Sequence, residues 1–202
     1  MLENLQPAAV FKYFEEMCQI PHGSYNVDKI SDYLMDFARE HGLQARQDQE
    51  KNVIMIKKAA KGMEDRKPIM IQGHMDMVAV KDPDCDKNME TDGLDLRIDG
   101  DYIYAEGTSL GGDDGIAVAY GLALLADDTL QLPRIELVVT TQEEVGMEGA
   151  AAIDLSCCEA TTMLNIDSET EGEFCVSCAG GIRIAASFDT NSNVVDDNCA
   201  LC

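Results

Sequence analysis

Four groups of side chains that could bind a metal ion stand next to apolar segments of the chain. They are His74 with Asp76, Asp113 with Asp114, Glu143 with Glu144, and Asp167. Packing so many carboxylates together would raise their pKa values and destabilise the fold, and a divalent cation between them removes that cost. A histidine among the ligands favours zinc over calcium. We therefore expect a site for a divalent metal ion.

The spacing within these groups suits different roles. His74 and Asp76 lie two residues apart, so both face the same side of an extended chain. A carboxylate placed in this way can orient the imidazole of a metal-binding histidine. Glu143 and Glu144 are adjacent and point in different directions, so one can bind metal while the other faces a water. Asp113 follows two glycines, which permit backbone conformations that other residues resist.

Each group alone has a simpler interpretation. His74 could be a buried histidine with ordinary hydrogen bonds. Asp113, Asp114 or Asp167 could cap a helix, and Glu143-Glu144 could begin a solvated loop. This alternative requires four unrelated coincidences beside apolar segments, so we favour the metal site.

The elements that would position these ligands alternate between helices and strands. Apolar periodicity predicts helices over 7–19, 27–41, 115–125 and 146–153. Strands are predicted over 44–47, 52–57, 68–72, 96–98, 102–104, 135–140 and 162–166, and, beyond Gly172, over 174–177 and 182–188. The segments 68–72, 135–140 and 162–166 are apolar enough to be buried. This alternation predicts an α/β fold, a three-layer sandwich around a largely parallel sheet, with ligands at the carboxyl ends of its strands.

Composition excludes several classes of partner. The chain has 202 residues, with 15 Lys+Arg against 38 Asp+Glu and a net charge of −23. This charge argues against nucleic acid or an anionic membrane surface as a partner. The longest apolar segment, 116–126, is too short to span a bilayer, and the N-terminus lacks the basic segment of a secretory signal. We therefore expect a cytoplasmic protein that binds neither nucleic acid nor membrane.

The eight cysteines leave one alternative open. In a reducing compartment they are expected to be free thiols. Two pairs, Cys175 with Cys178 and Cys199 with Cys202, could instead form a non-catalytic zinc-ribbon module. The strand-like segment between the pairs, and the position of Cys202 at the last residue, argue against a ribbon.

The motifs around the ligand groups resemble those of the co-catalytic dinuclear zinc peptidases. They are Gly73-His-Met-Asp76, Leu110-Gly-Gly-Asp-Asp-Gly115, Thr141-Gln-Glu-Glu144 with Gly146-Met-Glu-Gly149, and Leu164-Asn-Ile-Asp-Ser-Glu169. Their order and spacing are similar to those of the aminoacylhistidine dipeptidases (Xaa-His dipeptidases, carnosinase-like). The resemblance extends to Cys178-Ala-Gly-Gly181, where the smaller lid domain of that family begins.

The resemblance implies a set of metal ligands. His74, Asp113 and Asp167 would hold one Zn²⁺, and Asp113 would bridge to a second Zn²⁺ that Glu144 also binds. Co²⁺ or Mn²⁺ could replace zinc. In this family the bridging aspartate precedes a cis peptide, so the peptide bond between Asp113 and Asp114 is expected to be cis.

The resemblance also implies an activity, the hydrolysis of the peptide bond of dipeptides, especially Xaa-His. Glu143 would act as the general base that takes a proton from the attacking water and passes it to the leaving amine. Asp76 would hold His74 in place. An N-acyl amino acid deacylase or a tripeptidase of the same fold remains an alternative.

The chain departs from the family in length. Residues 1–178 correspond to the N-terminal part of the catalytic domain, and 179–202 to the start of the lid, which mediates dimerisation in the full-length proteins. Nothing corresponds to the later segment that carries the histidine ligand of the second metal, and neither His22 nor His41 matches it. We therefore expect an incomplete second site and a chain that is weakly active or inactive alone.

Overall fold

The computed structural model describes residues 1–168, 170, 172–177, 180 and 184–187. The chain divides into two compact units, Met1–Glu169 and Thr170–Cys202. The described residues of the second unit form neither helix nor strand. The strand predicted over 174–177 is therefore wrong: these four residues form no strand, and Phe174 and Val176 are 94% and 98% exposed. The strand predicted over 182–188, and the predicted domain boundary at 178/179, fall wholly or partly outside the described residues.

The helices and strands of the first unit follow the predicted order closely. The helices are α1 (Ala8–Cys18), α2 (Asp28–Glu40), α3 (Gly112–Ala126) and α4 (Glu148–Ala152). The strands are β1 (Gln44–Gln47), β2 (Val53–Lys57), β3 (Ile69–His74), β4 (Leu96–Asp99), β5 (Tyr102–Ala105), β6 (Ile135–Thr140) and β7 (Thr162–Asn165). Among the described residues, no helix is both long and apolar enough to cross a membrane.

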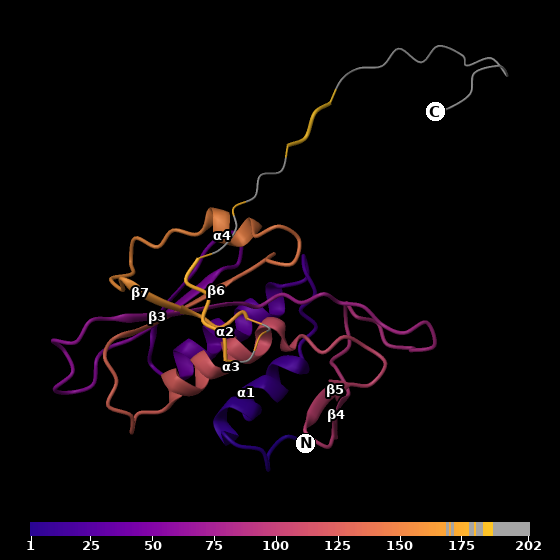
Figure 1. Cartoon of the computed structure of the whole chain (residues 1–202), viewed down its shortest axis with the longest axis horizontal. Coiled ribbons are helices and arrows are strands. Elements are labelled where there is room, and N and C mark those ends of the chain that lie inside the picture. The colour runs from indigo at the N-terminus through magenta and orange to yellow at the C-terminus, as the bar shows by residue number, and fades with distance from the viewer. Residues whose placement is uncertain (169, 171, 178–179, 181–183, 188–202) are drawn as a thin grey trace. The chain divides into compact units, whose positions relative to one another are not determined.

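Five strands form the central sheet in the order β1-β2-β6-β3-β7, while β4 and β5 pair as a separate hairpin. Strand β3 lies between β6 and β7 and is parallel to both. Strand β2 is antiparallel to β1 and to β6. The sheet is therefore mixed, with β2 alone reversed, and β3, β6 and β7 end at the same edge (Figure 1).

One face of the sheet carries the larger core. Side chains of β2, β3 and β6 that point to this face pack against α1, α2 and α3. Fully buried members of this core include Leu34, Val53, Val118, Leu122, Leu137 and Val139. Burying apolar side chains of this size stabilises a fold by about 1.5–3 kcal/mol each. This core fixes α3, whose first residues carry the aspartate pair, against β3 and β6.

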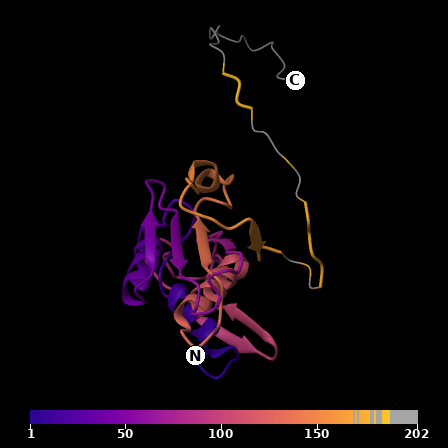
Figure 2. The ribbon, with the colours of Figure 1, turned by 90° about the vertical axis from the view of Figure 1, so that its left-hand side faces the viewer.

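The opposite face has a smaller core. Ile54, Ile56, Met70 and Val138 alternate along their strands with the residues of the larger core, and they pack against Ile153, Cys157, Cys158 and Ala160. Helix α4 lies on the opposite side of the sheet from α1 and α3, as Figure 2 shows. The third layer of the predicted sandwich thus consists of α4 and the segment 153–160, and the α/β fold class is confirmed.

Strand β7 differs from its prediction in burial. All four of its residues are exposed, with Met163 at 57% and Leu164 at 52%. The reason is its position at the edge of the sheet, where it pairs with β3 on one side only. Within the described residues, no element covers its other side, so its apolar side chains face solvent.

Candidate metal centre

The parallel arrangement of β3, β6 and β7 brings three of the four predicted ligand groups to one edge of the sheet. His74 is the last residue of β3, Glu143 and Glu144 follow β6, and Asp167 follows β7. The amide of Met75 donates to the carbonyl of Thr140 at 2.9 Å, which extends the pairing with β6 by one residue past the end of β3. The N-terminus of α3 supplies the fourth group.

His74 lies at the centre of this cluster and is 1% exposed. Its Nδ1 lies 2.9 Å from the backbone carbonyl of Asp76 and 3.5 Å from the Asp76 carboxylate. Its Nε2 faces the other acids, at 3.1 Å from Asp113, 3.9 Å from Glu143 and 4.0 Å from Asp167. The predicted pairing with Asp76 is therefore present, with the backbone carbonyl as the nearer partner. This leaves Nε2 free to face a ligand shared with the acids.

The carboxylate of Asp76 is buried and joins three segments. One oxygen accepts from Ser24 Oγ at 2.8 Å, and the other accepts from the backbone amide of Glu143 at 3.1 Å. Burial acts to raise the pKa of Asp76, but these hydrogen bonds and the one with His74 hold it below its usual value. Asp76 is therefore an ionised group that fixes His74 relative to Glu143.

The aspartate pair sits at the start of α3 in a non-helical conformation. Gly111 has φ 69°, the peptide between Asp113 and Asp114 is cis as expected, and neither residue has helical dihedrals. Helix α3 has no side-chain cap, so the capping interpretation of these aspartates is wrong. The kink turns the two carboxylates toward His74.

The sequence did not predict that Asp114 contacts His74. It is 2% exposed, and its Oδ2 accepts from the backbone amide of His74 at 3.1 Å. A Cβ on Gly73 would lie 2.6 Å from that oxygen, so only glycine allows the approach. The sequence feature that pointed to Asp114 was its place in an adjacent pair of aspartates next to a glycine-rich turn.

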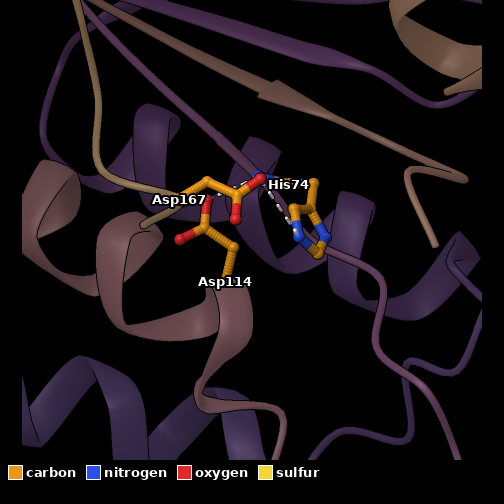
Figure 3. Close-up of side chains that lie close together, drawn as sticks. All are labelled: His74, Asp114 and Asp167. Atoms are coloured by element: carbon orange, nitrogen blue, oxygen red, sulfur yellow. Dashed lines mark hydrogen bonds and ion pairs between the residues drawn. The ribbon is translucent and has the colours of Figure 1, made fainter. Parts of the chain in front are cut away.

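Two groups of ligand atoms lie close enough to share an ion. The atoms of His74, Asp114 and Asp167 all lie within 4.8 Å of one another, and so do those of His74, Asp113 and Glu144. Figure 3 shows the first group, with Asp114 and Asp167 beside the His74 ring. The set predicted from the resemblance, His74 with Asp113 and Asp167, stays a prediction.

The acids of the site raise one another's pKa values. Burial, together with the charges of Asp167 and Asp113, raises the pKa of Asp114 to about 7 despite the nearby His74. Burial is also the main reason that the pKa values of Glu143 and Glu144 are raised. Burial acts to lower the pKa of His74, but the hydrogen bond with Asp76 and the charge of Asp114 raise it to about 9. A divalent cation would relieve this repulsion.

The donor set fits a transition-metal ion. One imidazole among several carboxylates is a set that Zn²⁺ accepts, and Co²⁺ or Mn²⁺ can occupy similar sites. The charges, the partly buried position and the orientation of His74 all favour a divalent cation. The arrangement is thus equipped to bind metal beside an unused carboxylate, that of Glu143.

The other two histidines lie outside this cluster. His22 is 3% exposed, and its Nδ1 lies 2.5 Å from the carbonyl of Ile20. His41 follows α2, where its ring packs against Phe37. Cys175 is a free, exposed thiol. The other three cysteines of the alternative zinc ribbon, Cys178, Cys199 and Cys202, lie outside the described residues.

Several known proteins are similar to this chain in sequence and in fold. No family model matches the chain. It is 37% identical over 194 residues to the cytosol non-specific dipeptidase of Escherichia coli, covering 96% of this chain and 40% of that protein. The aminoacylhistidine dipeptidase of Vibrio alginolyticus has a TM-score of 0.82 and 37% identity over 85% of this chain and 35% of that one. A tripeptidase of Staphylococcus aureus, at 22% identity and a TM-score of 0.67, shares the fold.

These comparisons confirm the resemblance stated from the motifs. The similarity covers nearly the whole chain but less than half of each dipeptidase. This share agrees with the expectation that the chain corresponds to one portion of such a protein.

Proposed function

We propose that this chain is the N-terminal part of the catalytic domain of a metal-dependent dipeptidase. The observation that carries the proposal is the orientation of His74, whose Nδ1 is held by Asp76 while Nε2 faces Asp113, Glu143 and Asp167. The similarity to two dipeptidases supports the same activity.

The ligand roles proposed here are those that the resemblance implies. His74, Asp113 and Asp167 would hold one zinc ion, and Asp113 together with Glu144 would hold a second. Zinc supplies Lewis-acid activation of the scissile carbonyl and lowers the pKa of water in such sites. Co²⁺ and Mn²⁺ are the expected substitutes.

Glu143 is the proposed general base. Its Oε2 lies 3.9 Å from His74 Nε2, and its backbone amide is fixed by Asp76. Burial raises its pKa above the usual range of a glutamate. A raised pKa suits a carboxylate that takes a proton from the attacking water and gives it to the leaving amine.

The proposed substrates are dipeptides, with Xaa-His as the preferred class. The Escherichia coli relative is named a non-specific dipeptidase and the Vibrio alginolyticus protein an aminoacylhistidine dipeptidase. The first name also supports a cytoplasmic location. In the full-length protein we expect a homodimer formed through the lid.

The chain alone is proposed to be weakly active or inactive. It spans 40% of the length of the Escherichia coli dipeptidase. The second metal site lacks its histidine here, and neither His22 nor His41 lies in the cluster. We therefore place full activity in the longer polypeptide.

Dipeptide hydrolysis tests the proposal. The chain would be joined to the remaining part of the Escherichia coli dipeptidase, loaded with zinc and assayed with an Xaa-His dipeptide. Replacing Glu143 by Gln should lower kcat by about 10²–10⁴-fold, the usual contribution of a general base. Zinc content should stay unchanged, because Glu143 is not a proposed ligand. A folded, zinc-loaded chimera that hydrolyses no dipeptide would contradict the function, and full activity of Glu143→Gln would contradict the role of Glu143.

A further inference from the structure

The turn that carries Glu143 and Glu144 is closed by its own backbone. It begins at Thr141, directly after β6, and ends at Gly149 in α4. The amide of Gly149 donates to the carbonyl of Thr141 at 3.1 Å, and the amide of Glu148 donates to the carbonyl of Gln142 at 3.3 Å. The two ends of this segment, the 141–149 turn, therefore lie side by side.

Asn52 contacts both ends of the 141–149 turn. Its Oδ1 accepts from the amide of Thr141 at 3.0 Å, and its Nδ2 donates to the carbonyl of Gly149 at 2.9 Å. The same Nδ2 donates to the carboxylate of Asp48 at 2.8 Å, which fixes the amide plane. Asn52 is 1% exposed, so both donors and the acceptor are used in a buried position.

The space between Asn52, Thr141 and Gly149 leaves no room for a side chain at Gly149. A Cβ on Gly149 would lie 2.4 Å from the carbonyl oxygen of Thr141 and 2.5 Å from Asn52 Oδ1. Leaving a buried donor or acceptor without its partner is costly, because neither water nor another group replaces the lost bond. The side chain of Asn52 is therefore a close-fitting link between the two ends of the turn.

We propose that Asn52 is a positioning residue that holds Glu143 and Glu144 at the metal centre by tying together the ends of the 141–149 turn. The side-chain hydrogen bonds of Asn52 go to Asp48, Thr141 and Gly149, so Asn52 acts on the glutamates through Thr141 and Gly149. The proposal rests on the proposed function for the roles of the two glutamates. The link itself does not depend on that function.

The first arm of the test needs no metal. Amide hydrogen exchange would be measured on the chain and on its Asn52→Ala variant. Exchange at the amides of Glu148 and Gly149 should become faster by about tenfold or more, with the sheet amides unchanged. Ser31→Ala is the matched control, because Ser31 is 0% exposed and its Oγ donates to Lys51, the neighbour of Asn52. The control should leave the turn amides unchanged.

The second arm measures how the carboxylates surround a bound cobalt ion. Cobalt would be added in excess, so that it also enters the weaker second site that Glu144 is proposed to bind, and its visible absorption then depends on which carboxylates bind it. The Asn52→Ala spectrum should match that of Glu144→Gln rather than that of the parent, and the double variant should show no further change. Ser31→Ala should give the parent spectrum.

Each outcome has a definite meaning. Unchanged exchange in the turn would overturn the link, and a parent-like cobalt spectrum with faster exchange would overturn the positioning role. If the parent chain bound no cobalt, the proposed function would fail, and the exchange arm alone would decide whether Asn52 holds the turn. If Asn52→Ala did not fold, Asn52→Asp would replace it, since Asp keeps the acceptor for Thr141 but loses the donor to Gly149.

Discussion

At the scale of single residues, the site depends on His74 having two different surroundings. Asp76 holds Nδ1, and the ring then presents Nε2 to Asp113, Glu143 and Asp167. The spacing of His74 and Asp76 was sufficient to predict this pairing from the sequence. Asp114 was not predicted as a partner, because its contact is with the backbone amide of His74 and depends on the absent Cβ of Gly73.

Asp114 gives a prediction about pH. Burial raises its pKa in the folded chain to about 7 from the 3.8 of an exposed aspartate. Between these values the unfolded chain is ionised at this residue and the folded chain is protonated, so metal-free stability falls as pH rises from about 4 to 7. The contribution is about 1 kcal/mol per pH unit or less. In Asp114→Asn this component should be absent, as measured by urea unfolding at several pH values in a chelator. An unchanged pH dependence would contradict the buried, protonated state of Asp114.

At the scale of elements, the C-terminus of α3 is held by a lysine from β2. Lys57 Nζ donates to the carbonyls of Leu125 and Asp127 at 2.8 and 3.0 Å, and to the carboxylate of Asp128 at 2.9 Å. A cation in this position offsets the partial negative charge of the helix end. The link matters for the site because α3 carries the aspartate pair at its other end.

Replacing Lys57 by Met should therefore lower the free energy of unfolding by about 1–2 kcal/mol, the range for charged hydrogen bonds and helix-end charges. Lys58→Met is the matched control, since Lys58 is the exposed neighbour. Urea denaturation of both variants tests this. Equal stability of the two variants would show that the Lys57 contacts contribute nothing.

Apolar periodicity predicted the order and type of the helices and strands. It did not predict how deeply each strand is buried or which distant residues contact it. Segments such as 135–140 contain only apolar residues and Thr or Glu, and β6 matches that prediction residue for residue. The segment 162–166 has similar composition, yet β7 is an exposed edge strand. Burial of a strand depends on its neighbours in the sheet, and strand order is not encoded in local periodicity. The same holds for the links made by Lys57 and Asn52, which join residues far apart in the chain.

At the scale of the whole molecule, the exposed edge of the sheet is the main liability. An edge strand whose outer side has no partner, and which carries apolar side chains, is a template for association with other chains. Met163 and Leu164 on β7 are more than half exposed. The relatives are more than twice as long as their matched part, so their chains contain further segments that could cover such an edge.

The isolated chain should therefore self-associate as its concentration rises, and Leu164→Lys should reduce this by placing a charge on the edge strand. Leu155→Lys is the control, because Leu155 is also exposed, at 42%, but is not part of β7. Sedimentation velocity measures both. A monodisperse parent, or an equal effect of the two substitutions, would contradict a role for β7.

The central claim is that His74 and the surrounding carboxylates hold a divalent metal ion. Calorimetric titration of the metal-stripped chain with zinc tests it most directly, with His74→Ala and, as control, the exposed His41→Ala. We predict one tight zinc site that His41→Ala leaves intact. His74→Ala should weaken it by about 100-fold or more, since loss of an outer partner alone can cost as much. Zinc binding that survives in His74→Ala, or no binding by the parent chain, would contradict the account.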